Sequence, residues 1–270
     1  MRVVVCNLHA GVDGWGRPSG SLDKVLALEP DIAILPETWR GASTDMVDEL
    51  ARAGLEGRFV PLARGERVAT TTGGRGWQPP LAHFTGERGI HLSEHRQLSR
   101  AQRHFLENSP VREPGEWGLS LVSRYPGEYT VVPLGRLPRE RVERYMILAR
   151  LTVDSRVLHV AALHGAHLSH GSPWMYARVR RHLDALEPLP LLLGGDFNCW
   201  RPLLRPLLPG YETRVRAKTW PAYRAHSQID HLLSRGPFRT TSSGALDVGS
   251  DHRALVGDLV LAGVESGEVS

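Results

Sequence analysis

The sequence predicts an α/β fold in which helices cover mixed or antiparallel β-sheets. Short apolar runs rich in valine, isoleucine and leucine recur along the chain, and such runs are typical of buried strands. A few segments with helix-start and helix-stop signals lie between them. Many strands with few interspersed helices pack into separate α and β layers. The 270 residues, 41% of them hydrophobic, are enough for one sizeable core, and we expect a single domain.

The first quarter of the chain predicts three strands and two short helices. The run at 2–8 is apolar and β-branched, which indicates a buried strand. Ser21 is placed to cap a helix over 22–29, which Pro30 ends. We expect a strand at 31–37, a helix from Ser43 or Thr44 to about Arg52, and a strand at 58–63.

Residues 64–116 differ from the rest of the chain. They are rich in arginine, histidine, glycine and proline and have little hydrophobic periodicity. This composition predicts an insertion formed by a long loop with one helix near 94–107. Loops of this length inside a domain are usually functional or disordered. The arginines of the insertion form either a solvated surface or one that binds phosphates or closes over a site.

Strand patterns resume after the insertion. We expect strands at 118–123, 129–134, 145–153 and 156–163, the last two joined by a hairpin-like turn at 154–155. Ser172 and Pro173 predict the start of a helix to about Leu186, with serine as the cap and proline at the first helical position. The final strands are expected at 189–194, 228–233 and 253–261.

Charge and cysteine content narrow the class of protein. The net charge is +4, and all but two of the 33 basic residues are arginine. A GC-rich genome explains this bias, or the arginines serve an anionic substrate, because guanidinium groups bind phosphate bidentately. Two cysteines make no disulfide framework. No apolar run approaches the roughly 20 residues of a membrane span, and without a secretory signal we expect a cytoplasmic protein.

Polar residues recur where the predicted strands end. Carboxylate and amide oxygens suit Mg²⁺ or Mn²⁺, and histidines beside carboxylates suit phosphate contact and proton transfer. Their number suggests convergence on one edge of the sheets. Asn7, Glu37, His164, Asp196 and Asn198 follow apolar strands, Asp230 lies within the segment SQIDHLL, and Asp251 and His252 precede the last strand.

The run LLLGGDFN at 191–198 is the clearest case of a strand that leads into polar residues. Side chains two apart on an extended chain share a side. We therefore expect Asp196 and Asn198 to face the site together, with Phe197 pointing back into the core.

Taken in order, these segments resemble the motifs of the endonuclease/exonuclease/phosphatase superfamily, which has the deoxyribonuclease I-like fold. The resemblance covers nearly the whole chain, and GDFN and SDH in this order form a specific pair. It implies a four-layer sandwich of two packed mixed β-sheets flanked by helices. The matching segments are Asn7, LPE ending at Glu37, GLSLVSRYP at 118–126, GGDFN at 194–198, QID at 228–230 and GSDH at 249–252.

The resemblance also implies a metal-dependent phosphoesterase. Glu37 would be the chief Mg²⁺ ligand, with Asn7 beside it and Asp251 near the metal; Mn²⁺ is the other candidate ion. A phosphoester is anionic and repels hydroxide, so a metal and cationic histidines must neutralise charge as the reaction proceeds.

The resemblance assigns the catalytic roles to five further residues. Asp196 would position or deprotonate the attacking water, and Asn198 would hold that water or the phosphate. His252, oriented by Asp230, and His164 would contact the phosphate from two sides. A carboxylate beside an imidazole keeps it protonated and aimed. No covalent nucleophile is needed.

Two departures from the family pattern leave alternatives open. The usual LQE is LPE here, and a proline is tolerable at a strand end. The usual THL is ALH followed by GAHLSH, so His167 competes with His164; we favour His164 because it continues the strand directly. Together with His170 and Cys199, these histidines raise the alternative of zinc, but the spacing fits no established zinc motif. The acidic partner that often supports the strand-end histidine is not identifiable.

Nucleic acid is the first choice of substrate, because the insertion and the net charge are basic. The alternative is a phosphorylated small molecule or lipid head group, and the lack of an apolar docking loop weighs against a lipid. A third alternative is a binding protein without activity. The presence of every expected metal-binding and catalytic residue argues against this alternative. Trp200 is a candidate for stacking on a base. The substrate-binding candidates are Arg64, Arg67, Arg75, Arg88, His167 and Trp200.

Overall fold

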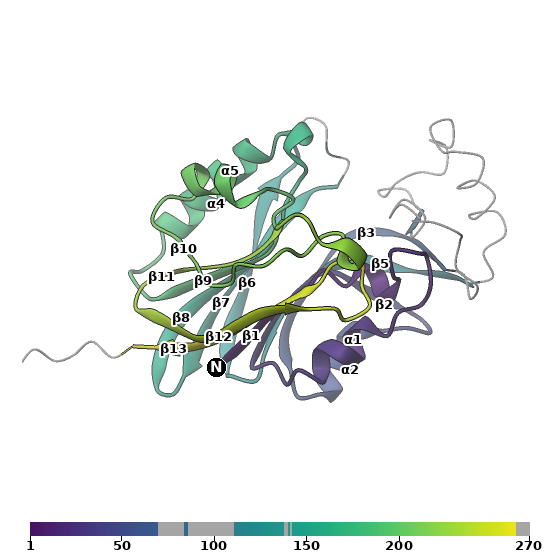
Figure 1. Cartoon of the computed structure of the whole chain (residues 1–270), viewed down its shortest axis with the longest axis horizontal. Helices are drawn as coiled ribbons and strands as arrows, with labels where there is room; N and C mark the ends of the chain where they lie inside the picture. Colours follow the sequence, from purple (N-terminus) through teal and green to yellow (C-terminus); the bar gives the residue numbers. More distant parts are fainter. Residues whose placement is uncertain (70–83, 86–110, 138–139, 141, 263–270) are drawn as a thin grey trace, which may run out of the picture.

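The computed structural model describes residues 1–69, 84–85, 111–137, 140 and 142–262. Two β-sheets pack against each other, and helices lie outside them (Figure 1). This arrangement confirms the predicted four-layer α/β sandwich. The helix predicted near 94–107 lies outside the described residues.

The first sheet contains seven strands and is mixed. Their bounds are β1 (Arg2–Val5), β2 (Ile32–Gly41), β3 (Glu56–Ala69), β4 (Phe84–Thr85), β5 (Val111–Ser123), β12 (Phe238–Leu246) and β13 (Ala254–Leu261). The strand order is β12-β13-β1-β2-β5-β3-β4. Only β1 and β2 are parallel neighbours; the other pairs are antiparallel.

The second sheet contains six strands and is also mixed. Their bounds are β6 (Gly127–Gly135), β7 (Arg144–Val153), β8 (Arg156–His164), β9 (Leu191–Asp196), β10 (Glu212–Thr213) and β11 (Asp230–Arg235). The order is β10-β11-β9-β8-β7-β6. Strands β8 and β9 run parallel, whereas β11 runs antiparallel to β9.

Four α-helices and three 3₁₀ turns are described. The helices are α1 (Ser21–Leu26), α2 (Met46–Arg52), α4 (Ser172–Asp184) and α5 (Arg201–Leu207), and the turns are η1 (His9–Gly11), η4 (Leu168–His170) and η5 (Ala222–Arg224). In the described part of the chain, no helix is long and apolar enough to cross a membrane.

The helix starts differ in detail from the sequence predictions. Ser21 and Ser172 are the first residues of α1 and α4, and the preceding glycines are the caps, without a side-chain cap bond. At α2 the cap is Asp45, whose side chain accepts from the backbone N–H groups of residues 47 and 48. A carboxylate that accepts hydrogen bonds from the first turn stabilises the helix start. The helix therefore begins at Met46, after its cap Asp45, and not at Ser43 or Thr44.

The core forms two clusters because the second sheet is apolar on both faces. One cluster fills the space between the sheets and includes the fully buried runs at 3–5 and 32–35. The other lies between the second sheet and α4 and α5. Strand β9 contributes to both, with Leu192 facing the sheet interface and Leu191 and Leu193 facing the helices. This burial on two faces explains its continuous leucine run.

The boundaries of the predicted insertion are too wide. Residues 64–69 continue β3, and residues 111–116 belong to β5; the two strands pair from 56 to 69 against 123 to 111. Long antiparallel strands can carry polar residues along their exposed face, so this stretch lacks the apolar runs that predict strands. Strand β12 and helix α5 are further elements that the sequence did not predict.

Candidate active site

Three predicted site residues form one row across the second sheet. His164 and Asp196 are the last residues of the parallel strands β8 and β9 and are register partners. Asp230 is the first residue of the antiparallel β11 and pairs with Asp196 on its other side. Because β11 starts where β9 ends, one edge of the sheet collects all three side chains.

Glu37 comes from the first sheet, at a break in the regularity of β2. The register with β5 shifts between Pro36 and Thr38, so Glu37 is the extra residue of a bulge, with φ 57°. Bulges re-aim side chains. The carbonyl of Pro36 still accepts a hydrogen bond, which Leu8 N donates at 2.9 Å. Proline in LPE is therefore accommodated at a bulge, where ladder pairing is already interrupted.

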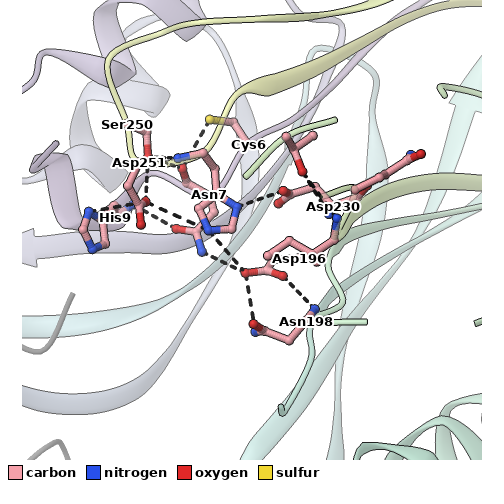
Figure 2. A network of polar contacts seen from close by, with 12 residues as sticks. Cys6, Asn7, His9, Asp196, Asn198, Asp230, Ser250 and Asp251 are labelled. Atoms are coloured by element: carbon pink, nitrogen blue, oxygen red, sulfur yellow. Dashed lines mark hydrogen bonds and ion pairs between the residues drawn. The ribbon is translucent and has the colours of Figure 1, made fainter. Parts of the chain in front are cut away.

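Asn7 connects the carboxylates of the two sheets. It follows β1, and its Nδ2 donates to Glu37 Oε1 at 3.0 Å and to Asp196 Oδ2 at 3.1 Å. Its Oδ1 accepts from the backbone N–H of His9 at 2.9 Å. Figure 2 shows Asn7 in the middle of this polar network. The predicted residues Asn7, Glu37 and Asp196 thus lie together.

Asp230 and His252 form a buried pair. Asp230 Oδ2 lies 2.8 Å from His252 Nδ1, and both residues are buried. Burial lowers the pKa of His252, but the carboxylates of Asp230, Asp251 and Asp196 outweigh burial and raise this pKa well above its ordinary value. The His252 Nε2 lies 3.9 Å from Asp196 Oδ2.

His164 lies on the other side of Asp196, and its pKa is shifted in the direction opposite to that of His252. Its Nε2 is 3.8 Å from both Glu37 Oε1 and Asp196 Oδ2. Burial, followed by the cations of Arg144 and His252, holds the pKa of His164 well below its ordinary value. Its Nδ1 has no hydrogen-bond partner among the described residues, and the Trp117 ring packs edge-on against it at 5.3 Å. An aromatic ring thus lies beside this histidine, for which the sequence indicated no acidic partner.

Asp196 is buried among charged groups of both signs. Burial and the neighbouring Asp230 carboxylate raise its pKa to about 7, against the opposing effects of His252, Asn198 and Asn7. A carboxylate with a pKa near neutrality is suited to accept a proton at physiological pH.

Asn198 faces Asp196, but through a turn and not through extended chain. Its φ is 48°, which is left-handed, and its backbone N–H donates to Asp196 Oδ1 at 2.8 Å. Its Nδ2 donates to Gly165 O at 3.0 Å. Asp196 and Asn198 lie together as predicted, but a left-handed turn brings them together and not an extended chain. Phe197 is fully buried, as predicted.

Two buried side chains hold the turn at 197–199, and the sequence prediction missed both. The Tyr176 hydroxyl donates to Phe197 O, and the two rings stack at 5.9 Å. His231 Nε2 lies 2.9 Å from Cys199 O, and the His231 ring packs edge-on against Phe197. His231 follows Asp230 directly, so its position next to QID was an available signal.

Asp251 lies against the loop that follows β1. Its Oδ1 is 3.4 Å from Nδ1 of His9, a residue that the prediction missed. Ser250 Oγ donates to Asn7 O at 2.6 Å, which ties the GSDH segment to the end of β1. His9 is followed closely by Gly11 in a left-handed run, a conformation that periodicity does not reveal.

The arrangement fits a divalent metal ion. Ligand atoms of Asp196, Asp230 and His252 all lie within 4.8 Å of one another, and no other such group occurs in the part of the chain that is described. Asp230 Oδ1 is buried without a hydrogen-bond partner, a state that costs free energy unless something compensates it. Carboxylate oxygens are hard ligands that suit Mg²⁺ or Mn²⁺. Cys199 of the zinc alternative is outside this group.

Arg67 needs correction as a substrate-binding candidate. Its guanidinium is buried, lies 2.8 Å from Glu113 Oε2 and donates to Thr44 Oγ1 and Ala10 O. Burial makes this ion pair part of the interior, where it holds the loop after β1 against β3. Because Arg67 is buried and paired with Glu113, its guanidinium is not exposed to bind a nucleic acid.

The other substrate-binding candidates are distributed around the site or lie outside the description. The Arg64 side chain is 84% exposed but pairs with Glu116 at 2.9 Å. His167 is exposed and packs edge-on against His170 at 5.6 Å, so the structure brings His164 and not His167 to the carboxylates. Trp200 is 53% exposed, two residues after Asn198. Arg75 and Arg88 lie outside the described residues.

A second ion-pair cluster supports the end of β8. Glu140 Oε2 accepts from Arg144 Nη2 at 2.9 Å, and its Oε1 lies 2.7 Å from His170 Nδ1. Arg144 Nη1 reaches His164 O at 3.4 Å. The prediction missed Glu140 and Arg144, because the segment at 136–143 has no pattern that marks it.

Comparison with known proteins shows the family of the chain. The family model for the endonuclease/exonuclease/phosphatase family matches residues 11–252. Comparison with the curated proteins finds no match.

Solved structures share the fold at low sequence identity. An endonuclease/exonuclease/phosphatase from Beutenbergia cavernae is 19% identical with a TM-score of 0.63, covering 97% of this chain and 72% of that one. The mannosyl-6-phosphatase Bt3783 of Bacteroides thetaiotaomicron is 13% identical with a TM-score of 0.58, covering 97% and 100%. The human Nocturnin catalytic domain, with bound sulfate, is 17% identical with a TM-score of 0.58, covering 97% and 93%. Because its family model spans most of the sequence, the chain belongs to the endonuclease/exonuclease/phosphatase family.

Proposed function

We propose that the protein hydrolyses phosphoesters with a divalent metal ion, by direct attack of water, and that nucleic acid is its substrate. The observation that supports this most strongly is the position of Asp196 between two histidines. Its Oδ2 lies 3.8 Å from His164 Nε2 and 3.9 Å from His252 Nε2. A base flanked by two phosphate-binding groups is what in-line attack on phosphorus requires.

Each residue then has a distinct task. Asp196 accepts a proton from the attacking water, for which its pKa of about 7 is suited. The cationic His252, held by Asp230, donates a hydrogen bond to a phosphate oxygen as negative charge develops. Neutral His164 contacts the phosphate without adding a second positive charge. Asn198 orients the water or the phosphate.

The metal would be held by the carboxylates of both sheets. Glu37, with Asn7 beside it, comes from the first sheet, and Asp230, whose Oδ1 has no hydrogen-bond partner among the described residues, comes from the second, with Asp251 nearby. When bound, Mg²⁺ or Mn²⁺ would neutralise phosphate charge and lower the pKa of water. Asn7 already holds Glu37 and Asp196 together through two hydrogen bonds, which pre-orients carboxylates from opposite sheets.

The preference for nucleic acid rests on the net charge of +4 and on general attraction of basic proteins to phosphate polymers. A specific observation favours the alternative of a phosphorylated small molecule. Arg67 is buried in an ion pair, and Arg64 pairs with Glu116. The basic character of the described part of the insertion is thus partly neutralised.

The test is hydrolysis by the purified full chain. After removal of metal with a chelator, Mg²⁺ or Mn²⁺ is added with supercoiled DNA, RNA, bis-p-nitrophenyl phosphate or a panel of phosphomonoesters. We expect metal-dependent cleavage of nucleic acid. Rapid phosphate release from a monoester without cleavage of nucleic acid would overturn the choice of substrate and favour the alternative.

Asp196→Asn tests the mechanism. We expect it to abolish hydrolysis while thermal melting shows a folded protein. Asp48→Asn is the matched control, because Asp48 is exposed on α2 and pairs only with Arg52 among the described contacts. Full hydrolytic activity of Asp196→Asn would refute the assignment of Asp196 as the base.

A further inference from the structure

Trp15 and Tyr223 form an aromatic pair that has no part in the chemistry described so far. Trp15 belongs to the loop between η1 and α1, and Tyr223 is the middle residue of η5. Their ring centroids are 5.5 Å apart. The first loop continues from β1 of the first sheet, and η5 lies between β10 and β11 of the second. The ring contact therefore joins a loop that follows the first sheet to a turn that belongs to the second.

Hydrogen bonds fix η5 to the GSDH segment. Ala222 N donates to Asp251 O at 2.7 Å, and Arg253 Nε donates to Ala222 O at 2.9 Å. Tyr223 thus directly follows Ala222, which is hydrogen-bonded to the main chain of Asp251. On the opposite side, the His9 ring approaches the Asp251 carboxylate at 3.4 Å. The turn η5 is therefore anchored to Asp251, and η1, which precedes the Trp15 loop, contacts the carboxylate of the same residue.

The Trp15 loop is internally ordered by Asp13. Its Oδ1 accepts from the backbone N–H groups of Trp15 and Arg17, both at 2.9 Å, and its Oδ2 pairs with the Arg17 guanidinium. Asp13 N donates in turn to Arg17 O at 2.8 Å. A loop held in this way presents its aromatic ring without a large entropy cost on ligand binding.

Tyr223 remains available for a ligand, and Trp15 beside it is half-buried. Tyr223 is 54% exposed, and the planes are tilted by 51°, so neither ring covers the face of the other as stacked rings do. An exposed, positioned aromatic next to a catalytic segment gains free energy when a planar ligand covers it.

We propose that Trp15 and Tyr223 form a platform that stacks on a nucleobase of the substrate, on the Asp251 side of the scissile phosphate. This rests on the proposed phosphoesterase function and narrows its substrate to nucleotide-containing phosphodiesters. A base needs only a ring face for such stacking. Sugar recognition needs free polar side chains as well, and Asp13 and Arg17 beside Trp15 already pair with each other.

The experiment compares two esters that share a p-nitrophenolate leaving group. One is thymidine 5′-(p-nitrophenyl phosphate), and the other is methyl p-nitrophenyl phosphate, which has no base. The measured quantity is the ratio of their kcat/KM values. We expect Tyr223→Ala and Trp15→Ala each to lower this preference for the thymidine ester by about tenfold, within the range measured for base–aromatic stacking.

Two further variants separate stacking from a loss of structure. Tyr223→Phe keeps the ring and is expected to keep the preference. Trp174→Ala removes an equally exposed aromatic from α4, at 63% exposure, and is expected to leave the preference unchanged. An unchanged ratio in both Tyr223→Ala and Trp15→Ala would overturn the platform.

Failure of the proposed function would give a different result. In that case the wild-type protein hydrolyses neither ester at any Mg²⁺ or Mn²⁺ concentration. Binding of thymidine 5′-monophosphate, followed by quenching of tryptophan fluorescence, then tests the platform alone. Binding that weakens about tenfold in Tyr223→Ala, the same range as above, supports it; equal binding by the variant, or none by the wild type, refutes it.

Discussion

Removal of the Tyr176 hydroxyl is predicted to weaken the turn that carries Asn198. This hydroxyl donates to Phe197 O, and its ring stacks on the Phe197 ring at an interplanar angle of 11°. Tyr176→Phe keeps the stacked ring and deletes only the donor. The substitution therefore tests one hydrogen bond at a buried site without creating a large cavity.

The magnitude follows from the space around the Phe197 carbonyl. A Cβ on Gly165 would lie 2.4 Å from this oxygen, so backbone atoms fill the space that a replacement water would need. An unsatisfied buried acceptor costs about 1–3 kcal/mol, and without water we expect a loss of about 2 kcal/mol. That corresponds to a roughly thirtyfold shift in the folding equilibrium.

Activity should fall with stability because Asn198 is in a left-handed conformation that its surroundings must maintain. Small displacements of positioning groups cost up to about a hundredfold in rate, and we expect kcat to fall about ten- to a hundredfold with a smaller change in KM. Urea denaturation and steady-state kinetics measure the two effects.

Tyr129→Phe is the matched control. The Tyr129 hydroxyl also donates to a backbone carbonyl, that of Glu56 at 3.1 Å, but at an exposed position where water can replace it. We expect a loss of at most about 1 kcal/mol there and unchanged kinetics. If Tyr176→Phe matched this control in both stability and rate, the hydroxyl would not hold the turn.

Three further predictions concern charge and backbone. Asp230→Asn should lower the rate about a hundredfold or more and move the alkaline limb of the pH–rate profile to lower pH, because the carboxylate raises the pKa of His252; an unmoved limb would contradict the pairing. Surrounding N–H groups and a guanidinium outweigh burial and lower the pKa of Glu113 below its ordinary 4.5, so its contribution to stability is complete above that pH and disappears as the pH falls through the lowered value. Glu113→Gln should remove this acid-dependent component from urea unfolding curves, and equal pH dependence would refute it. Gly195→Ala should not yield folded protein, because φ is 140° and the Cβ would lie 1.8 Å from Leu163 O; a normal melting transition would show that the strand can adapt.

The sequence was informative about the site wherever an apolar run ends in a polar residue. Leu191–Leu193 lead to Asp196, and the parallel β8 leads to His164 in the same register row. Parallel strands end on one edge of a sheet, and an antiparallel neighbour begins there. Regular strand geometry therefore converts a one-dimensional pattern into a shared location, and this part of the site could be predicted.

Elements without an apolar pattern could not be predicted. Strand β12 lies at the edge of its sheet and exposes most of its residues, so it lacks the run that indicates a strand. Helix α5 contains Pro202 and Pro206, and proline argues against a helix wherever it is not in the first turn. The edge position determines the exposure of β12, and tertiary contacts support α5. The local sequence shows neither of these.

The same limit explains why Arg67 was misjudged. Within its own segment it is one arginine among many exposed ones, such as Arg64. Its guanidinium is buried because Glu113 lies opposite it on the neighbouring strand β5, 46 residues further along the chain. The pairing of β3 with β5 has to be known before the two charges can be matched, and composition alone favours the solvated interpretation.

The site residues that deviate from regular geometry share a physical cause. His9, Glu37 and Asn198 all have positive φ, and such backbone costs about 1–3 kcal/mol for each non-glycine residue unless surrounding bonds impose it. All three are held by the same network: Asn7 binds His9 N and Glu37, and Asp196 binds Asn198 N. Regular strands bring the side chains to one edge, but their pleat alternates directions and cannot aim adjacent groups at one phosphate. The irregular positions provide the required directions, and the polar groups that stabilise them are those to which we assign the proposed reaction.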